Sequence, residues 1–330
     1  MKNIYVVNAY KENLGDFLIF KSFLNNVSSI HDHLNIFDLH IKEVAEYKFA
    51  ENSVLIFPGG PLLNNNLKNK NLDYGKFFQK ALKNKILIIL FGVGLGVDFN
   101  FELGFNENNT KILQSISEYS PVFCRDNITY EFLKKNNINS EVSGCPVLNF
   151  EITNHLNNFQ NKTLISDPGF RNSSRLLYFF IFCIKLINKE SKNGNIEFLF
   201  NANFLSKDGT SRKRYYTQQL LIKYLKLKKI KILKSKEILE NNKLFSYKKH
   251  IGFRVHTHLL FLANNLNSTL ISEDIRGVGQ IELFNTYKQE LPKVLQNINK
   301  YIDDEVATQK NTKVIRYKDL NIQTLKHLKF

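Results

Sequence analysis

The sequence is poor in several residue types that mark particular classes of protein. Its 330 residues include no tryptophan, one methionine and three cysteines. Cys124, Cys145 and Cys183 are odd in number and widely spaced, so they form neither a disulfide framework nor a metal-binding pattern. Phenylalanine and tyrosine, with 28 and 14 residues, can fill a core in place of tryptophan. We therefore expect a globular protein of a reducing compartment, without a metal site.

Long apolar runs are also absent. The closest approach, residues 176–184, ends at Lys185, well short of the roughly 18 apolar residues of a membrane-spanning helix. Ile4 to Val7 is too short for the apolar region of a secretory signal, which predicts a cytoplasmic protein. The 176–184 run predicts either a core helix or, because four basic residues surround it, a peripheral contact with an anionic membrane face. The four basic residues are Arg171, Arg175, Lys185 and Lys189.

Acidic residues are the minority charge. The chain has 46 lysines and arginines against 30 aspartates and glutamates, a net charge of +16. Such a surface attracts nucleic acid, anionic lipid or phosphorylated substrates, or it reflects a genome in which lysine is a frequent surface residue. The basic clusters at 207–214 and 226–231 accompany no nucleic-acid-binding motif and no interleaved stacking aromatics. We therefore predict no nucleic-acid partner.

The chain does contain a repeated order of apolar strand, loop and helix. This alternation in both halves predicts an α/β fold of two Rossmann-like domains, each with a mostly parallel sheet, facing each other across a cleft that holds the working site. The expected strands are residues 4–8, 54–57, 86–91, 121–124, 141–144, 163–166, 196–200, 231–233 and 268–271. The expected helices are residues 17–24, 76–82, 127–135 (with Asp126 as N-cap), 173–189, 215–227 and 255–264.

A polar stretch without periodicity, residues 149–162, separates the two halves. We therefore predict an N-terminal domain at 1–150 and a C-terminal, donor-binding domain at 151–305. The tail at 306–330 is polar and basic. It is expected either to pack back on the N-terminal domain as a closing helix or to form a loose end.

In open α/β sheets, ligands bind beyond the carboxyl ends of the strands. Four parts of the sequence have unusual polar or glycine content at such ends: residues 8–16, residues 58–61, residues 92–98, and the pair 254–258 and 272–277. The third part, Gly92-Val-Gly94-Leu-Gly96, begins like a dinucleotide fingerprint, but Val97 stands where the last glycine belongs. We expect a turn that lets the backbone approach a ligand, not an NAD site.

Several charged residues in these segments are candidates for chemistry. Arg254 and His256 stand two apart at a predicted helix start and offer two donors to one anion. Asp16 is either a helix cap or a general base. Arg125 ends a strand at the sheet edge, and a further cluster follows the last strand. That cluster is Glu273, Asp274 and Arg276. Cys145 has no evident histidine partner, which favours a buried thiol over a nucleophile.

The order of these motifs resembles that of the polysaccharide pyruvyl transferase family, over roughly residues 1–285. The matching segments in the first half are Asn13-Leu-Gly15-Asp16, Phe57-Pro-Gly59-Gly60, Gly92-Val-Gly94-Leu-Gly96, Cys124-Arg125-Asp126 and Gly144-Cys145-Pro146. Those in the second half are Gly252-Phe-Arg254-Val-His256, Ile271-Ser-Glu273-Asp274-Ile-Arg276 and Glu282-Leu283. The chain departs from the family at Pro61, where many members have a third glycine, and at Glu273, where relatives often have histidine.

The resemblance implies a fold similar to the GT-B glycosyltransferases and a role in capsule or exopolysaccharide synthesis. It implies transfer of a pyruvyl group from phosphoenolpyruvate to hydroxyls of a sugar or lipid-linked glycan, forming a ketal, with no further cofactor. Asp16 and His256 would then be the catalytic pair, assembled by domain closure. The donor-binding residues would be Arg125, Arg254, Arg276, Gly59, Gly60 and Gly94. The alternatives are a GT-B glycosyltransferase that uses a nucleotide sugar on a lipid-linked glycan, and a non-catalytic polysaccharide-assembly protein.

Overall fold

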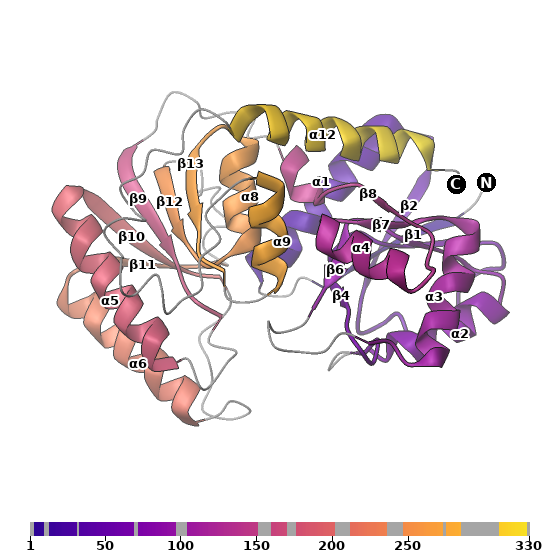
Figure 1. Cartoon of the computed structure of the whole chain (residues 1–330), viewed down its shortest axis with the longest axis horizontal. Coiled ribbons are helices and arrows are strands. Elements are labelled where there is room, and N and C mark those ends of the chain that lie inside the picture. The colour runs from indigo at the N-terminus through magenta and orange to yellow at the C-terminus, as the bar shows by residue number, and fades with distance from the viewer. Residues whose placement is uncertain are drawn as a thin grey trace.

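The computed structural model has two α/β halves with helices between them (Figure 1). It describes residues 3–9, 13–31, 33–68, 72–96, 104–150, 160–169, 176–201, 212–235, 247–272, 275–284 and 310–328. Three helices lie where the halves meet: α1 (Leu14–Ile30), α8 (Val255–Ala263) and α9 (Ile275–Phe284). α8 contacts both α1 and α9. The predicted pair of halves with parallel sheets is confirmed.

The first half holds two parallel four-stranded sheets, whereas the sequence predicted one. The first has the order β2-β1-β3-β5, formed by β1 (Asn3–Asn8), β2 (Asn35–His40), β3 (Val54–Phe57) and β5 (Leu87–Leu90). The second has the order β4-β6-β7-β8, formed by β4 (Gly60–Leu63), β6 (Val93–Leu95), β7 (Val122–Cys124) and β8 (Ser140–Val142). The helices of this half besides α1 are α2 (Tyr74–Lys83), α3 (Glu107–Tyr119) and α4 (Asn127–Lys135).

Glycines split the first sheet from the second. The chain bends at Gly59 and Gly60, with φ angles of +134° and +91°, and at Gly92, with φ of +60°, conformations that L side chains rarely adopt. A Cβ on Gly92 would also lie 2.7 Å from Cδ of Pro146. The chain then resumes strand pairing, with Gly60 opposite Val93. The strand ends at Leu90 and the chain turns at Gly92, as predicted, but residues 93–95 then form β6 and are not part of the turn.

The second half is a parallel five-stranded sheet with the order β11-β10-β9-β12-β13. Its strands are β9 (Gln160–Ser166), β10 (Asn195–Phe200), β11 (Lys231–Lys234), β12 (Tyr247–Gly252) and β13 (Asn267–Leu270). α5 (Leu176–Asn193) and α6 (Arg212–Leu227) pack against each other on its outer side (Figure 1). The strand β12 was not predicted, because Lys248, Lys249 and His250 interrupt its apolar pattern.

The apolar run at 176–184 belongs to α5, and one side of that helix is core. Phe179, Phe182 and Cys183 are buried in a cluster with Phe198 and Phe253, so the core-helix interpretation is confirmed for this face. No helix in the described ranges is long and apolar enough to cross a membrane.

A shared apolar core and a C-terminal helix join the halves. Leu14 and Leu18 of α1 pack in one cluster with Leu164 and Leu259 of the second half. The helix α12 (Lys310–His327) crosses back over the first half, where it contacts α1 and the 3-10 turn η1 (Pro146–Asn149) (Figure 1). Leu325 of α12 is buried in the core around β1. The residues of the tail that the structure describes therefore form a closing helix on the N-terminal half.

Candidate functional site

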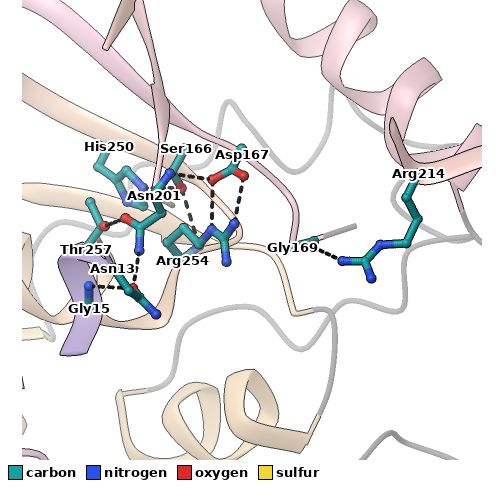
Figure 2. A network of polar contacts seen from close by, with 10 residues as sticks. All are labelled: Asn13, Gly15, Ser166, Asp167, Gly169, Asn201, Arg214, His250, Arg254 and Thr257. Atoms are coloured by element: carbon teal, nitrogen blue, oxygen red, sulfur yellow. Dashed lines mark hydrogen bonds and ion pairs between the residues drawn. The ribbon is translucent and has the colours of Figure 1, made fainter. Parts of the chain in front are cut away.

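Asn201, directly after β10, connects the two halves (Figure 2). Its backbone carbonyl accepts a hydrogen bond from the N–H of Leu14 at 3.2 Å, and its side-chain amide lies 3.4 Å from Oδ1 of Asn13. Within the second half, Oδ1 of Asn201 accepts a hydrogen bond from the hydroxyl of Thr257, in the first turn of α8, at 3.2 Å. These contacts hold the start of α1 against the start of α8, so the candidate residues of both halves meet here.

Arg254, the N-cap residue of α8, is held by Asp167 (Figure 2). Nε donates to Oδ1 at 2.8 Å and Nη2 to Oδ2 at 2.7 Å, a bidentate pair of the strongest geometry available to arginine. Asp167 directly follows β9 and also accepts from the N–H of Asn201 at 3.0 Å. The sequence predicted Arg254 as a donor-binding cation, but the carboxylate that orients this guanidinium was not predicted.

The start of α8 has no side-chain cap. The helices α1, α2, α3 and α4 each have a side-chain N-cap, from Asn13, Asp73, Asn106 and Asp126 respectively. Arg254 at the N-cap of α8 provides no such hydrogen bond. A helix N-terminus with uncapped N–H groups is a favourable place for phosphate or carboxylate.

His256 lies in the first turn of α8, against the first turn of α1. A Cβ placed on Gly15 would overlap Nδ1 of His256, so the glycine makes room for the ring. The other ring nitrogen, Nε2, is buried and makes no hydrogen bond with any residue that the structure describes. Burial, and then the positive charges of Arg125, Arg276 and Arg254, lower the pKa of His256 from 6.5 to about 3. The imidazole is therefore neutral near pH 7 and has an unsatisfied polar atom that a ligand can complete.

Arg125 is a buried cation rather than a residue at an open sheet edge. It is only 1% exposed, with Nε donating to Oδ2 of Asp126 at 3.0 Å and Nη2 to the carbonyl of Leu95 at 3.0 Å. Asp126 also caps α4 as predicted, accepting from the N–H of Thr129 at 2.8 Å. Nη1 of Arg125 makes no hydrogen bond within the described part of the chain. Nη1 of this guanidinium is therefore the nitrogen that could bind a ligand. The positive charge of Arg125 also acts on His256.

Asp16 and Arg276 each stand in the first turn of a helix at this site. Asp16 is in the first turn of α1, where its Oδ2 accepts from the side-chain amide of Asn13 at 2.9 Å. Its charge helps to raise the pKa of Tyr74, after burial, so the carboxylate faces the first half. Arg276, in the first turn of α9, acts electrostatically on His256. Because the space beside Gly15 is filled by the His256 ring, the two halves already meet at this point of the structure.

Other predicted residues have structural roles or lie outside the described ranges. A Cβ on Gly94 would overlap the Arg125 guanidinium, so packing explains this glycine. The positive φ angles at the bend between β3 and β4 explain Gly59 and Gly60. Cys145 is buried in the shared core, and burial raises the pKa of its thiol to about 11, which supports the buried-thiol interpretation. Glu273 and Asp274 lie outside the described residues.

Two further histidines, His250 and His258, have structural roles. His250 is fully buried, with Nε2 at 2.9 Å from the hydroxyl of Ser166 and Nδ1 at 2.7 Å from that of Ser268. His258 shares the Ser268 hydroxyl at 2.8 Å. Ser166 in turn accepts from the N–H of Arg254 at 3.3 Å. These hydrogen bonds connect β9, β12 and β13 with Arg254 at the start of α8. Figure 2 shows the part formed by His250, Ser166 and Arg254.

Comparison with known proteins decides the family of the chain. A family model described as polysaccharide pyruvyl transferase matches residues 13–274, a range that contains Asn13, Asp16, Arg125, Arg254 and His256. The chain belongs to the polysaccharide pyruvyl transferase family. It is a transferase that modifies polysaccharide. No curated protein sequence matches it significantly.

Solved structures similar to this family member show its fold. A MnaA–UDP structure from S. aureus is 10% identical, with a TM-score of 0.58 over 95% of this chain and 91% of that one. UDP-GlcNAc 2-epimerase from Neisseria meningitidis, bound to UDP-GlcNAc, is 10% identical, with a TM-score of 0.58 over 98% and 99%. The Methanocaldococcus jannaschii epimerase with UDP-GlcNAc and UDP is 13% identical, with a TM-score of 0.55 over 96% and 98%. The pyruvyl transferase chain therefore has a GT-B-like fold, as the resemblance implied.

Two features of the structure limit where a ligand of this transferase can bind. A cavity of about 520 Å³ lies beside the C-terminal end of α2, and none of the predicted site residues lines it. No group of three or more histidine, cysteine, aspartate or glutamate side chains in the described part of the chain is arranged to hold a metal ion. The residues that the structure brings together are the cations and the neutral imidazole around the start of α8.

Replacing Gly15 by alanine tests the contact between α1 and His256 in this transferase. Alanine favours helix over glycine by about 1 kcal/mol, but its Cβ would displace the His256 ring. We expect a loss of kcat/KM of about tenfold or more with a thermal midpoint within a few degrees of the parent. Gly104, which has nothing within 4 Å of an added Cβ, provides the control Gly104→Ala. An unchanged kcat/KM in Gly15→Ala would mean that the position of the His256 ring does not matter for the reaction.

Proposed function

We propose that the chain transfers a pyruvyl group from phosphoenolpyruvate to two hydroxyls of a sugar, forming a cyclic ketal. The observation that carries this proposal is the surroundings of His256, a neutral imidazole with an unpartnered Nε2 among Arg125, Arg254 and Arg276. Phosphoenolpyruvate carries a phosphate and a carboxylate, which match arginines and an uncapped helix start.

Donor binding is proposed to prepare the acid. Burial and, after it, the charges of the three arginines lower the pKa of His256. The negative charges of the bound donor oppose both effects because they favour the imidazolium, so the imidazole gains a proton in the complex. Nε2–H can then donate that proton to the methylene carbon of the enol, and the adjacent carbon becomes cation-like. A general acid placed in this way contributes about 10²- to 10⁴-fold to the rate.

The remaining steps balance around that carbon. One sugar hydroxyl adds to it and loses its proton to Asp16, which forms a tetrahedral phospho-ketal. The bond from the carbon to the phosphate oxygen then breaks, and phosphate leaves with the electron pair while the arginines stabilise its charge. The second hydroxyl adds and its proton goes to the departing phosphate, which completes the ketal, and Asp16 then returns its proton to solvent. Asp16 is proposed for this role because it stands in the first turn of α1, the turn that packs against His256.

Proton uptake on donor binding tests the proposed state of His256. We expect phosphoenolpyruvate to bind with uptake of a proton near pH 7, because the pKa of His256 rises from about 3 toward neutrality in the complex. Its affinity should therefore increase as the pH falls from about 8 to about 6, relative to a His256→Gln variant. Calorimetry in two buffers of different ionisation enthalpy measures the uptake. Equal proton uptake by the two proteins would contradict the mechanism, and the variant also corrects for titration of the donor itself.

A nucleotide-sugar donor is the second candidate, because similar folds were solved with UDP and UDP-GlcNAc. At about 100 times Kd, a ligand of the folded state stabilises it by about 2.7 kcal/mol, which thermal unfolding detects. Stabilisation by phosphoenolpyruvate, and not by UDP-GlcNAc or by sulfate at equal ionic strength, supports pyruvyl transfer. The reverse order supports glycosyl transfer, and no stabilisation by either supports a non-catalytic assembly protein. Phosphate release and mass gain with a panel of sugars then identify the acceptor.

A further inference from the structure

Exposed apolar side chains are concentrated on one side of the second half. Ten large hydrophobic residues of the described chain are strongly exposed, and six of them lie on α5 and α6. The six are Leu177, Tyr178 and Ile181 on α5, and Tyr216, Leu220 and Leu227 on α6. These two helices pack side by side on the outer side of the sheet, away from the first half (Figure 1). We call the exposed side of this helix pair the α5–α6 face.

On α6, the apolar residues occupy the positions furthest from the core. Tyr216, Leu220 and Leu227 are spaced by four and seven residues, so they form one stripe along the helix. The opposite side, with Leu221 and Leu225, is buried against the sheet and α5. A helix on the surface of a globular protein normally has charged residues at its outermost positions. On α6 the charged residues lie beside and between the apolar ones instead. These charged residues are Arg212, Lys213, Lys223 and Lys226.

The charge of the α5–α6 face has one sign. The sequence of α6 contains no aspartate or glutamate, and its exposed charged residues are all basic. On α5, the one acidic residue is Glu190, which is buried and lies 3.6 Å from Nζ of Lys249. Exposed Lys185 and Lys192 add positive charge on α5. The face therefore combines an apolar centre with basic flanks and presents no carboxylate from either helix.

We propose that the α5–α6 face binds the surface of an anionic lipid bilayer. Apolar side chains enter the headgroup region while lysines and arginines beside them contact anionic headgroups. A second copy of the chain fits this face poorly, because two such faces would bring like charges together. A nucleic acid would match the lysines but would leave the Tyr216, Leu220 and Leu227 stripe exposed. The sequence placed a membrane contact at residues 176–184, and the structure adds the exposed stripe on α6 to the three exposed apolar residues of that segment.

The orientation of the helices relates this face to the candidate site. α5 and α6 follow β9 and β10, and the same strand ends carry Asp167 and Asn201. Leu177 stands in the first turn of α5 and Tyr216 in the second turn of α6, near that edge of the sheet, whereas Leu227 is the last residue of α6. The α5–α6 face therefore runs along both helices, from the edge that carries Asp167 and Asn201 to the opposite edge. The inference does not depend on which donor the site uses.

Vesicle sedimentation of the full chain tests this proposal. We expect about tenfold or greater partitioning to vesicles of phosphatidylcholine with 30% phosphatidylglycerol over phosphatidylcholine alone, weakened by salt. Two triple variants should each reduce that binding about tenfold. They are Tyr216→Ser/Leu220→Ser/Leu227→Ser and Lys213→Glu/Lys223→Glu/Lys226→Glu. The matched controls use exposed residues elsewhere, on α2, α3 and α12, and should bind within about twofold of the parent. They are Tyr119→Ser/Ile315→Ser and Lys80→Glu/Lys83→Glu.

Several outcomes would overturn the proposal. Binding that survives the serine variant would show that the apolar stripe does not enter the bilayer, and loss in the controls would show that the attraction is not specific to this face. A parent that is dimeric and becomes monomeric in the serine variant, without binding vesicles, would assign the face to a second copy. Binding of single-stranded RNA in preference to vesicles would assign it to nucleic acid. Circular dichroism of each variant confirms that losses do not come from unfolding.

Discussion

Replacement of His256 by glutamine is expected to lower kcat/KM for pyruvyl transfer by about 10²- to 10⁴-fold, the usual contribution of a general acid or base. Glutamine is of similar size and can still form a hydrogen bond, but it cannot carry a proton. Folding should be unaffected or slightly improved, because Nε2 of His256 has no partner among the described residues and its pKa of about 3 means that the folded state disfavours the charged form. Phosphate release in the presence of an acceptor measures the loss.

The control for this prediction is a histidine outside the site. His327 lies exposed at the end of α12, so His327→Gln should retain full activity. Asp16→Asn separates the two proposed roles: it should lower kcat while donor affinity stays close to that of the parent. Full activity in His256→Gln would remove this residue from the mechanism. Loss of donor affinity in Asp16→Asn equal to its loss of kcat would assign Asp16 a structural role, through its hydrogen bond with the N-cap residue Asn13.

The strands that the sequence predicted well are those whose side chains are buried on both faces. The segments 54–57 and 86–91 are continuous apolar runs, and they form β3 and β5 within one residue of the predicted bounds. β12 was missed because His250 stands in its centre. That residue is buried only because Ser166 and Ser268 satisfy both ring nitrogens. The two serines lie 84 and 18 residues from His250 in the sequence, so the local pattern around His250 could not predict them.

The site was predicted in part. His256, Arg254 and Asp16 were singled out, and the structure brings the first turns of α1 and α8 into contact. Asp167 and Asn201 were missed, although a usable signal existed. Each directly follows a correctly predicted strand, β9 or β10, and the carboxyl ends of neighbouring parallel strands meet at one edge. The ion pair of Arg254 with Asp167 links residues 87 apart, and only the folded chain reveals it.

The glycines show why a motif alone does not define a binding residue. Gly94 was predicted to bind the donor because glycine lets a backbone approach a ligand. In the folded chain the space beside it is filled by the guanidinium of Arg125. Gly279 has a similar role on α9, where an added Cβ would lie 2.7 Å from Cγ of Asp126. Both glycines therefore allow close packing around a buried ion pair, and that pair supplies part of the positive charge that acts on His256.

Gly94→Ala is therefore expected to destabilise the protein by about 3–5 kcal/mol, the cost of breaking a buried ion pair. The added Cβ would push the Arg125 guanidinium away from Asp126 and from the carbonyl of Leu95. This is a large part of the roughly 5–15 kcal/mol by which a typical protein is stable, so the yield of folded protein should also fall. The denaturation midpoint in urea measures the effect, with Gly104→Ala as the neutral control.

A double-mutant cycle shows whether the effect acts through Arg125. If the clash with the guanidinium is the cause, Gly94→Ala should add little to the destabilisation already produced by Arg125→Ala, because the Cβ then has room. Additive effects of the two substitutions would mean that Gly94 is needed for another reason, such as the backbone of β6. A cost of Gly94→Ala below about 1 kcal/mol would contradict the packing argument and would restore Gly94 as a candidate for ligand binding.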